Sequence, residues 1–220
     1  MTSKATTTEA LYDLIYEDFG WRRREIVLFN SQLNKIGPEF QKALLRSSVA
    51  LLYAHWEGFV KNACTHYLSY LSTRRISFQD LRPELAALSL RGRMTTAALA
   101  KKNSLHADLV RQIRECASDR ARIPTNSDAI RTESNLSYPV LEEILASVGC
   151  NPLLYEQYRD LIDEQLVLAR NKIAHGEYSF IKRTEWDELS TQVLWIMDDI
   201  ATQIMNAAVE ETYFASKVKK

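Results

Sequence analysis

The chain has 220 residues, of which 46% are hydrophobic and 25% charged, and its 28 Lys and Arg are matched by 28 Asp and Glu. This length suits one domain with a sizeable core, and the zero net charge excludes a protein that attracts nucleic acid through its overall charge. Only 6 Gly and 5 Pro are present, well below the average usage of about 7% and about 5%. Because helix breakers are scarce, we predict a single all-helical domain over residues 1–220.

The three cysteines, Cys64, Cys116 and Cys150, are far apart, odd in number and without a CxxC pair. This pattern indicates neither a zinc site nor a disulfide framework, and it predicts free, buried thiols in a reducing cytoplasm. The N-terminus lacks the pattern of a signal peptide. The most apolar run, residues 49–60, is too short to span a membrane, which needs about 20 apolar residues. We therefore expect a cytoplasmic protein with no membrane partner.

A first long helix is predicted directly after the polar segment 1–7, which we expect to fray. Its start lies near Thr8, and apolar residues follow at helical spacing as far as Leu33. The pair Gly37-Pro38 separates this helix from the next one, because a proline suits the first turn of a helix.

The second helix is predicted to run from Pro38 to Thr73 and to lie at the centre of the fold. Apolar residues occur on more than one of its sides between residues 50 and 60, which is typical of a buried helix. Polar side chains in such a stretch need partners or must face a cleft. His55 and Glu57 are therefore candidate site residues.

Residues 76–137 are the least regular part of the chain and are predicted to form an insertion of short helices and loop. Helical fragments are expected around residues 83–90 and 97–113. From Arg74 to Arg131 there are 12 Lys and Arg against 6 Asp and Glu, a difference of +6. Such a basic stretch can hold phosphates locally, although on charge alone a solvated helical face is the more ordinary interpretation.

Two further helices are predicted after this insertion. Ser137 is expected to cap a short helix, residues 138–148, that ends at Gly149. The next helix is expected to start near Pro152 and to run to His175.

A last long helix is predicted near the end of the chain. Thr184 with Asp187 resembles a capping box in which Asp replaces the usual Glu. Apolar residues spaced three or four apart continue from Trp186 to Ala207. Residues 215–220 are expected to fray.

The stretch Ala169–Gly176 (ARNKIAHG) carries the most distinctive polar residues. Asn171 and His175 are four apart and lie on one face of a helix, whereas Arg170 and His175 are five apart, about 140° round the helix. Gly176 favours a helix end here because glycine readily adopts the left-handed cap conformation. Arg170 and His175 can therefore cooperate if the helix ends at His175, or if a second copy of the segment faces the first.

An arginine and a histidine are sufficient for one kind of chemistry. An imidazole, which changes its charge near neutral pH, can take a proton from a ribose 2′-hydroxyl and return one to the leaving 5′-oxygen. A guanidinium suits a phosphate whose negative charge grows during the attack. Arg170 and His175 therefore fit metal-independent RNA cleavage by internal transesterification, although an Arg-x4-His pair alone is also compatible with an ordinary surface helix end.

Three stretches together carry a resemblance to a known family. They are LYAHWEGFVK at residues 52–61, Ser134-Asn135-Leu136 leading to Gly149, and RNKIAHGE at residues 170–177. In this order they resemble the RiboL-PSP-type proteins of the HEPN superfamily of helical ribonucleases, whose signature is Arg-Asn-x-x-x-His. The resemblance covers about residues 40–208.

The resemblance implies an antiparallel helical bundle that acts as a homodimer and cuts RNA, as a toxin or an antiviral-defence effector. Arg170 and His175 would then form the catalytic pair, and Asn171 would be the polar residue that follows the arginine. An antitoxin or a defence-system protein is a candidate partner beside the RNA substrate. The alternative function is a HEPN module without catalysis that binds RNA, a nucleotide or a protein partner.

Glu57, His55 and Lys172 are supporting candidates, each with an ordinary alternative. Glu57 can reach Arg170 or a substrate, or it can form a salt bridge that stabilises the fold. A satisfied core or cleft histidine is the more ordinary role for His55, and a solvated surface position is the more ordinary role for Lys172. No Gly-rich phosphate loop and no cluster of metal ligands occurs in the sequence, so we expect neither a cofactor nor a metal.

Overall fold

The chain folds into helices in the computed structural model, which describes residues 5–33, 35–115, 117–126 and 128–217. None of these residues belongs to a β-strand, although isolated β-bridges join Ser77 to Arg120 and Leu81 to Phe214. The predicted all-α fold is therefore confirmed. No helix in this described part combines the length and the apolar character that crossing a membrane requires.

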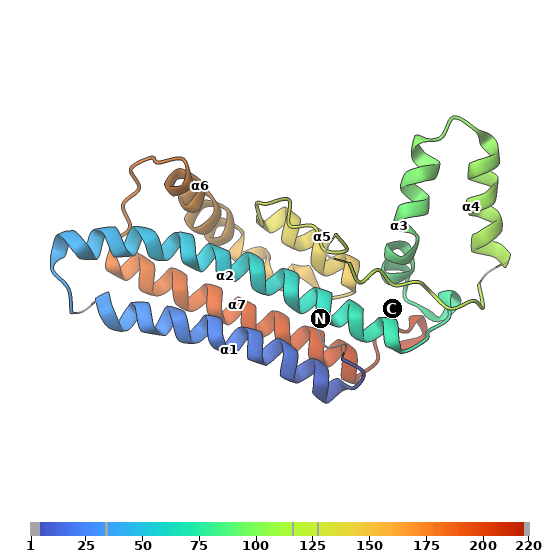
Figure 1. Cartoon of the computed structure of the whole chain (residues 1–220), viewed down its shortest axis with the longest axis horizontal. Helices are drawn as coiled ribbons and strands as arrows, with labels where there is room; N and C mark the ends of the chain where they lie inside the picture. The colour runs from blue at the N-terminus through green and yellow to red at the C-terminus, as the bar shows by residue number, and fades with distance from the viewer. Residues whose placement is uncertain (1–4, 34, 116, 127, 218–220) are drawn as a thin grey trace.

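Three long helices lie side by side and form the body of the bundle (Figure 1). They are α1 (Thr8–Leu33), α2 (Pro38–Thr73) and α7 (Arg183–Val209). α1 runs antiparallel to α2 and α7 (Figure 1). The bounds of α1 and α2 are those predicted, because the extended backbone of Gly37 and the proline that follows it separate the two helices.

The core between these helices is filled by large side chains. Trp56 and Tyr67 of α2 and Trp186 of α7 are fully buried. The indole N–H of Trp186 donates to the Oδ1 of Asn30 in α1 at 2.5 Å, which satisfies a polar group that would otherwise be costly to bury. The apolar residues on several sides of α2 thus explain its burial, as predicted.

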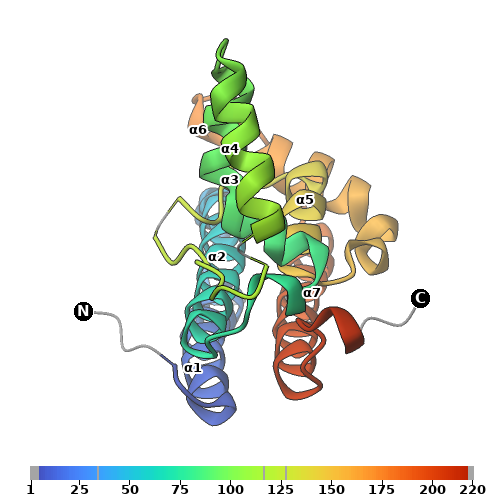
Figure 2. The same ribbon diagram turned by 90° about the vertical axis from the view of Figure 1, so that its right-hand side faces the viewer.

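The predicted insertion contains a helical hairpin, α3 (Pro83–Leu99) and α4 (Asn103–Glu115), which projects from the bundle (Figures 1 and 2). The predicted fragments 83–90 and 97–113 have the wrong bounds. The break falls at Ala100, whose extended backbone (φ −82°, ψ 135°) ends α3. Neither Gly nor Pro marks this break, and apolar residues continue at helical spacing on both sides of it. The break could therefore not be detected from the sequence.

The short helix α5 (Tyr138–Val148) has the predicted bounds and ends at Gly149, whose φ of 81° is left-handed. Ser137 occupies the N-cap position, but its side chain makes no capping hydrogen bond. Instead, the N–H of Tyr138 donates to the Oδ1 of Asp163 at 2.6 Å. The predicted serine cap is therefore wrong, because a carboxylate from a later segment accepts the bond from the start of the helix.

The segment predicted as one helix that reaches His175 changes its hydrogen-bonding pattern along its length. It comprises a 3₁₀ stretch, η2 (Pro152–Tyr158), a π-helix, η3 (Leu161–Leu168), and α6 (Ala169–Ala174). The buried pairs Leu161-Ile162 and Leu166-Val167 repeat every five residues, and the i→i+5 turn of a π-helix keeps such pairs on one face. The prediction of one regular α-helix is therefore wrong. The π-helix ends directly before the candidate site.

α7 begins at Arg183, and Lys182 is its N-cap. The N–H of Lys182 donates to the carboxylate of Glu185 at 2.9 Å, which is the contribution that the third helical residue makes to a capping box. The predicted capping box of Thr184 and Asp187 is wrong, because Asp187 instead pairs with the Nε of Arg183 at 2.8 Å.

Two of the three cysteines are described, and both are free and buried as predicted: Cys64 and Cys150. Burial raises the pKa of the Cys150 thiol to about 12 and raises that of Cys64 as well. Cys116 lies outside the described residues. Because the thiolate is the reactive form, Cys64 and Cys150 are structural rather than chemically active.

The two ends of the chain were predicted to fray. Residues 1–4 and 218–220 lie outside the described residues. The hydroxyl of Thr7 accepts a hydrogen bond from the N–H of Ala10 at 3.1 Å, and the 3₁₀ turn η4 (Ala215–Lys217) follows α7.

Candidate active site

The helix that carries the Arg-Asn-x-x-x-His stretch ends where the sequence predicts. α6 stops one residue before His175, which is the C-cap with φ −85° and ψ 6°, and Gly176 has a left-handed φ of 77°. The N–H groups of Gly176 and Glu177 donate to the carbonyls of Ile173 and Lys172, which makes a Schellman motif. The backbone of His175 is therefore held at a helix end, while its side chain is exposed.

Arg170 is held on two sides by other elements. Its guanidinium carbon lies 3.7 Å from the centroid of the Tyr53 ring on α2, well within cation–π distance. Its Nη2 donates to the carbonyl of Ser134 at 2.9 Å. Its Nε is buried and has no hydrogen-bond partner among the described residues. The guanidinium is thus fixed in direction, and its buried Nε is left without a hydrogen bond inside the described part of the protein.

The loop that contacts Arg170 is itself clamped to α2. The N–H of Leu136 donates to the hydroxyl oxygen of Tyr53 at 2.8 Å, and the indole N–H of Trp56 donates to the carbonyl of Leu136 at 3.1 Å. Both rings are buried, and burial is the main cause that raises the pKa of Tyr53. Bonding of both backbone groups of Leu136 therefore places the nearby Ser134 against Arg170.

Two neighbouring residues of this loop have a strained backbone. Glu133 and Ser134 have φ angles of 54° and 55°, and the left-handed region costs a residue with a side chain roughly 1–2 kcal/mol. The hydroxyl of Thr132 donates to the Oε1 of Glu57 at 2.6 Å on one side of them, and the clamp on Leu136 lies on the other. Tertiary contacts on both flanks thus maintain the strain, which is a common feature of functional sites.

Asn171 connects the same loop to α6. Its amide Nδ2 donates to the Oδ1 of Asn135 at 3.2 Å, and its carbonyl accepts the N–H of His175 at 3.0 Å. No hydrogen bond or ion pair joins the His175 ring to Arg170 or to any other residue in the described part of the chain. Asn171 therefore fixes the backbone of the site, and the imidazole projects without a partner.

The structure separates the three supporting candidates. His55 faces α1, where its Nε2 lies 2.7 Å from the Oε2 of Glu25 without an aligned hydrogen bond, and burial is the main cause that lowers its pKa. Glu57 lies beside the loop through its bond with Thr132, and the described residues contain no ion pair between it and Arg170. Lys172 is exposed. His55 therefore lies away from the Arg170 loop, whereas Glu57 lies next to it.

Two residues of this region were overlooked in the sequence. Tyr53 lies within the stretch LYAHWEGFVK, where its position on an apolar helix made it indistinguishable from core. Arg46, also on α2, donates from its Nη2 to the carbonyl of Glu177 at 2.7 Å, and its Nε is buried with no hydrogen-bond partner among the residues that the structure describes. A second guanidinium therefore flanks the end of α6, and a lone arginine among the apolar residues of α2 was the signal available for it.

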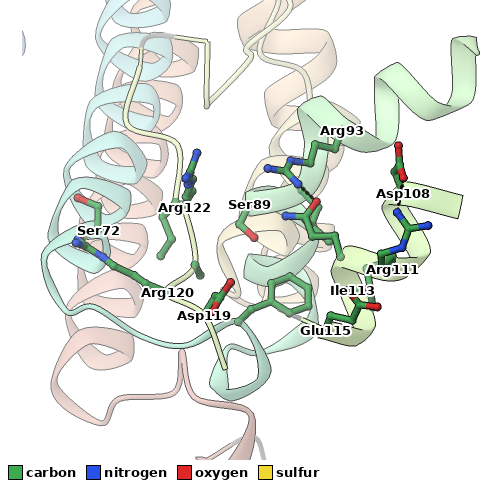
Figure 3. Close-up of a pocket in the computed structure, with 15 residues that line it drawn as sticks. Ser72, Ser89, Arg93, Asp108, Arg111, Ile113, Glu115, Asp119, Arg120 and Arg122 are labelled. Atoms are coloured by element: carbon green, nitrogen blue, oxygen red, sulfur yellow. Dashed lines mark hydrogen bonds and ion pairs between the residues drawn. The ribbon is translucent and has the colours of Figure 1, made fainter. Parts of the chain in front are cut away.

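A cavity of about 780 Å³ lies elsewhere, between the α3–α4 hairpin and the loop at residues 119–123 (Figure 3). None of its lining residues belongs to the Arg170 region. The candidate catalytic side chains are therefore displayed at a helix end and not in this cavity. Within the described ranges, no three His, Cys, Asp or Glu side chains are grouped so that they can hold a metal ion.

Comparison with known proteins identifies a family for this chain. The family model described as HEPN_MAE_28990-like HEPN matches residues 11–213. No curated protein and no solved structure matches the chain. The matched residues include the bundle, the projecting hairpin and the Arg170 region, which agrees with the expected HEPN superfamily. The RiboL-PSP subtype remains a prediction.

Proposed function

The chain belongs to the HEPN_MAE_28990-like HEPN family, whose model covers residues 11–213, and from this premise we propose that the protein is a metal-independent endoribonuclease. HEPN membership points to a nuclease or an RNA-binding module. The choice between these two rests on the residues at the end of α6.

The proposed reaction is internal transesterification of RNA. The His175 imidazole removes the proton of a ribose 2′-hydroxyl, the 2′-oxygen forms a bond to phosphorus, and the bond from phosphorus to the 5′-oxygen breaks. The leaving 5′-oxygen receives a proton from an imidazolium. Arg170 holds the phosphate, whose negative charge grows in the transition state. The products are a 2′,3′-cyclic phosphate and a 5′-hydroxyl, and no metal enters the scheme.

The single observation that carries the proposal is the state of Arg170. Tyr53 and Ser134 fix its guanidinium, yet its Nε has no partner among the described residues. A purely structural arginine is expected to use its donors within the fold, because an unpaired buried N–H group costs free energy. Arg170 is only partly buried, so a guanidinium fixed in direction suits an anionic ligand on its exposed side, and the preorganisation lowers the cost of stabilising charge in the transition state.

The proposal includes a homodimer. Arg170 and His175 lie about 140° apart round a helix, and no hydrogen bond or ion pair joins them in the described part of the chain. An exposed His175 at the end of α6 is free to meet the Arg170 of a second copy across a twofold axis, which would bring both groups to one phosphate. A strict monomer is then expected to be a poor nuclease.

The decisive experiment incubates the purified full chain with single-stranded RNA in the presence of EDTA, beside His175→Ala and Arg170→Ala. We expect cleavage that tolerates EDTA, yields 2′,3′-cyclic phosphate ends, and falls by about 10²–10⁴-fold without the imidazole. Cleavage that requires a divalent metal, or that survives His175→Ala, would contradict the mechanism. RNA binding without turnover would instead favour the alternative of a non-catalytic HEPN module.

The biological setting extends the same proposal. An RNA-cutting HEPN protein suits a toxin or an antiviral-defence effector in the cytoplasm, where an antitoxin or another defence component holds its activity in check. Expression of the wild-type chain is then expected to slow growth, and His175→Ala is expected to relieve that effect at an equal protein level. Equal toxicity of the two chains would contradict this role.

A further inference from the structure

The cavity of about 780 Å³ beside the α3–α4 hairpin has a lining that the Arg170 chemistry does not use. Four arginines from three elements line it (Figure 3): Arg93 of α3, Arg111 of α4, and Arg120 and Arg122 of the loop at residues 119–123. Three carboxylates line it as well, and one of them, Asp108, is paired with Arg111 at 2.6 Å. Arginine therefore outnumbers carboxylate in the lining, within the part of the chain that carries a charge excess of +6.

One wall of the cavity is held in place by backbone hydrogen bonds. The N–H of Phe78, in the 3₁₀ turn η1 (Phe78–Asp80), donates to the carbonyl of Asp119, and the N–H of Ala121 donates to the carbonyl of Ile76, both at 2.9 Å. The loop that carries Arg120 is therefore fastened to the residues after α2. A wall that is ordered in advance loses less conformational entropy when a ligand binds.

The arginines keep donors for a ligand. Arg122 is exposed, and its side chain makes no hydrogen bond or ion pair with any described residue. Arg93 donates to the Gln112 amide oxygen of α4 (Figure 3), and its remaining N–H groups have no partner in the described part of the chain. A guanidinium with free N–H groups binds the oxygens of a phosphate in a paired geometry.

The cavity also presents apolar surface. Phe78 is half-buried in the lining, and Leu90, Ile113 and Ile123 lie around the same space. An aromatic ring next to several arginines is the combination that binds single-stranded nucleic acid, because bases stack on the ring while the cations hold the backbone. A lone inorganic anion would not use this apolar part.

We propose that this cavity binds a single-stranded segment of the RNA substrate, at a site separate from the cleavage site. Arg93, Arg122 and their neighbours hold successive phosphates, and Phe78 carries a base. RNA is favoured over a free mononucleotide because the arginines come from α3, α4 and the loop, and so surround more space than one phosphate occupies. This inference rests on the proposed function, since it assigns a second contact to the same substrate.

The test measures RNA binding without cleavage. In a full-length His175→Ala background, Arg93→Glu with Arg122→Glu is compared with Lys101→Glu and Lys102→Glu, which change the charge equally on exposed residues of the same hairpin outside the cavity. The probe is a fluorescent single-stranded RNA of about 12 nucleotides. We expect the cavity variant to raise Kd roughly tenfold or more and to lower the salt slope by about 1.4, which corresponds to two phosphate contacts.

A milder variant keeps the test valid if the double substitution disturbs the hairpin. Arg122→Gln replaces a guanidinium that has no intramolecular partner among the described residues with a neutral amide. We expect this loss of charge to raise Kd about threefold. The lysine control is expected to change Kd by about twofold or less. The proposal that the cavity binds RNA would be overturned if the lysine and arginine variants weakened RNA binding equally. Unchanged RNA affinity in both arginine variants would overturn it as well. So would tight binding of AMP that RNA does not displace, since that result assigns the space to a mononucleotide.

The two proposals can fail separately. If the wild-type chain cuts no RNA but the arginine variants lose RNA binding, the nuclease proposal fails and the cavity stands. If the wild-type chain cuts RNA and the arginine variants bind it normally, only the cavity fails. In chains that retain His175, we expect the cavity substitutions to raise KM with little change in kcat, because this site does not touch the reacting atoms.

Discussion

The guanidinium carbon of Arg170 lies 3.7 Å from the centroid of the Tyr53 ring, and the hydroxyl oxygen of that ring accepts the N–H of Leu136. One side chain of α2 thus orients the arginine with its face and holds the neighbouring loop with its hydroxyl. The loop in turn supplies the Ser134 carbonyl to the Nη2 of Arg170. Tyr53 is therefore the residue through which the buried core determines the direction of the candidate phosphate-binding group.

The two roles of Tyr53 can be separated by substitution. Tyr53→Phe keeps the ring under Arg170 but leaves the Leu136 N–H unpaired, which is expected to lower the free energy of unfolding by about 1–3 kcal/mol. Tyr53→Leu removes the ring as well, and with it the orientation of the guanidinium. We expect kcat for RNA cleavage to fall at least about tenfold further in Tyr53→Leu than in Tyr53→Phe. Equal kcat values in two folded variants would count against a positioning role.

The helix end at Gly176 depends on the left-handed backbone conformation of this residue. Its φ is 77°, and a Cβ placed there meets no atom within 4 Å, so Gly176→Ala is expected to lower the free energy of unfolding by about 1 kcal/mol through backbone strain. Gly92→Ala is the matched control, because Gly92 lies inside α3 with equally open surroundings, and there alanine is expected to add about 0.5–1 kcal/mol. Urea denaturation measures both changes, and destabilisation of the same size in both variants would contradict this account.

Mixing inactive chains tests whether the site is shared between protomers. If each site takes Arg170 from one chain and His175 from the other, a heterodimer of Arg170→Ala and His175→Ala contains one intact site. Random exchange of the two variants is then expected to restore about a quarter of the wild-type activity, since half of the dimers are mixed and each has one working site of two. No recovery after exchange, verified by labelled chains, would show that each protomer works alone or that the pair is not catalytic.

His55 is expected to make stability depend on pH. Burial lowers its pKa in the folded protein, and Arg22 acts in the same direction, while Glu25 and Asp18 oppose them. The unfolded chain, with a pKa near about 6.5, therefore binds more protons as the pH falls. The contribution of His55 to the free energy of unfolding is fully present above about pH 6.5 and is lost as the pH falls through the folded pKa. His66, whose pKa burial also lowers, contributes with the same sign.

The corresponding measurement is urea denaturation between about pH 5 and pH 7. His55→Gln removes one of the two imidazoles whose pKa burial lowers, so the fall in unfolding free energy with decreasing pH is expected to become shallower without disappearing. An unchanged or steeper pH dependence in the variant would contradict the assigned direction of the His55 pKa.

The described thiols are expected to be unreactive in the folded protein. Burial raises the pKa of Cys150 to about 12 and that of Cys64 well above the ordinary value, and both side chains are buried. In a Cys116→Ser chain, a thiol reagent at about pH 8 should therefore modify no cysteine until denaturant is added, and then both. Rapid modification of either thiol in the native protein would show that this part of the core opens.

The bounds of α1, α2 and α5 could be predicted because residues at the helix ends set them. Gly37-Pro38 separates α1 from α2, and Gly149 ends α5, since proline and glycine have conformational preferences that do not depend on the rest of the fold. The break at Ala100 and the π-helix before Arg170 could not be predicted in this way. The residues involved are ordinary helix formers, and tertiary packing decides between helix types of similar energy.

The candidate site shows the same division. The stretch from Arg170 to Gly176 was identifiable from residue type and spacing, and the helix end at Gly176 follows from the glycine itself. The contact of Arg170 with Tyr53 joins residues that are far apart in the sequence. The spacing of residues within either helix therefore does not predict it. The same limit applies to Arg46, whose bond to Glu177 exists only because α6 lies against α2.

By itself, the sequence therefore determined the helical class, the bounds of α1, α2 and α5, and the identity of the candidate catalytic pair. These properties follow from local propensity, from the spacing of apolar residues and from a short motif. Only the tertiary structure decided which side chains hold Arg170, that His55 turns toward α1, and that four arginines of the insertion line one cavity. Such contacts depend on how distant helices pack, and many packings are compatible with the same local pattern.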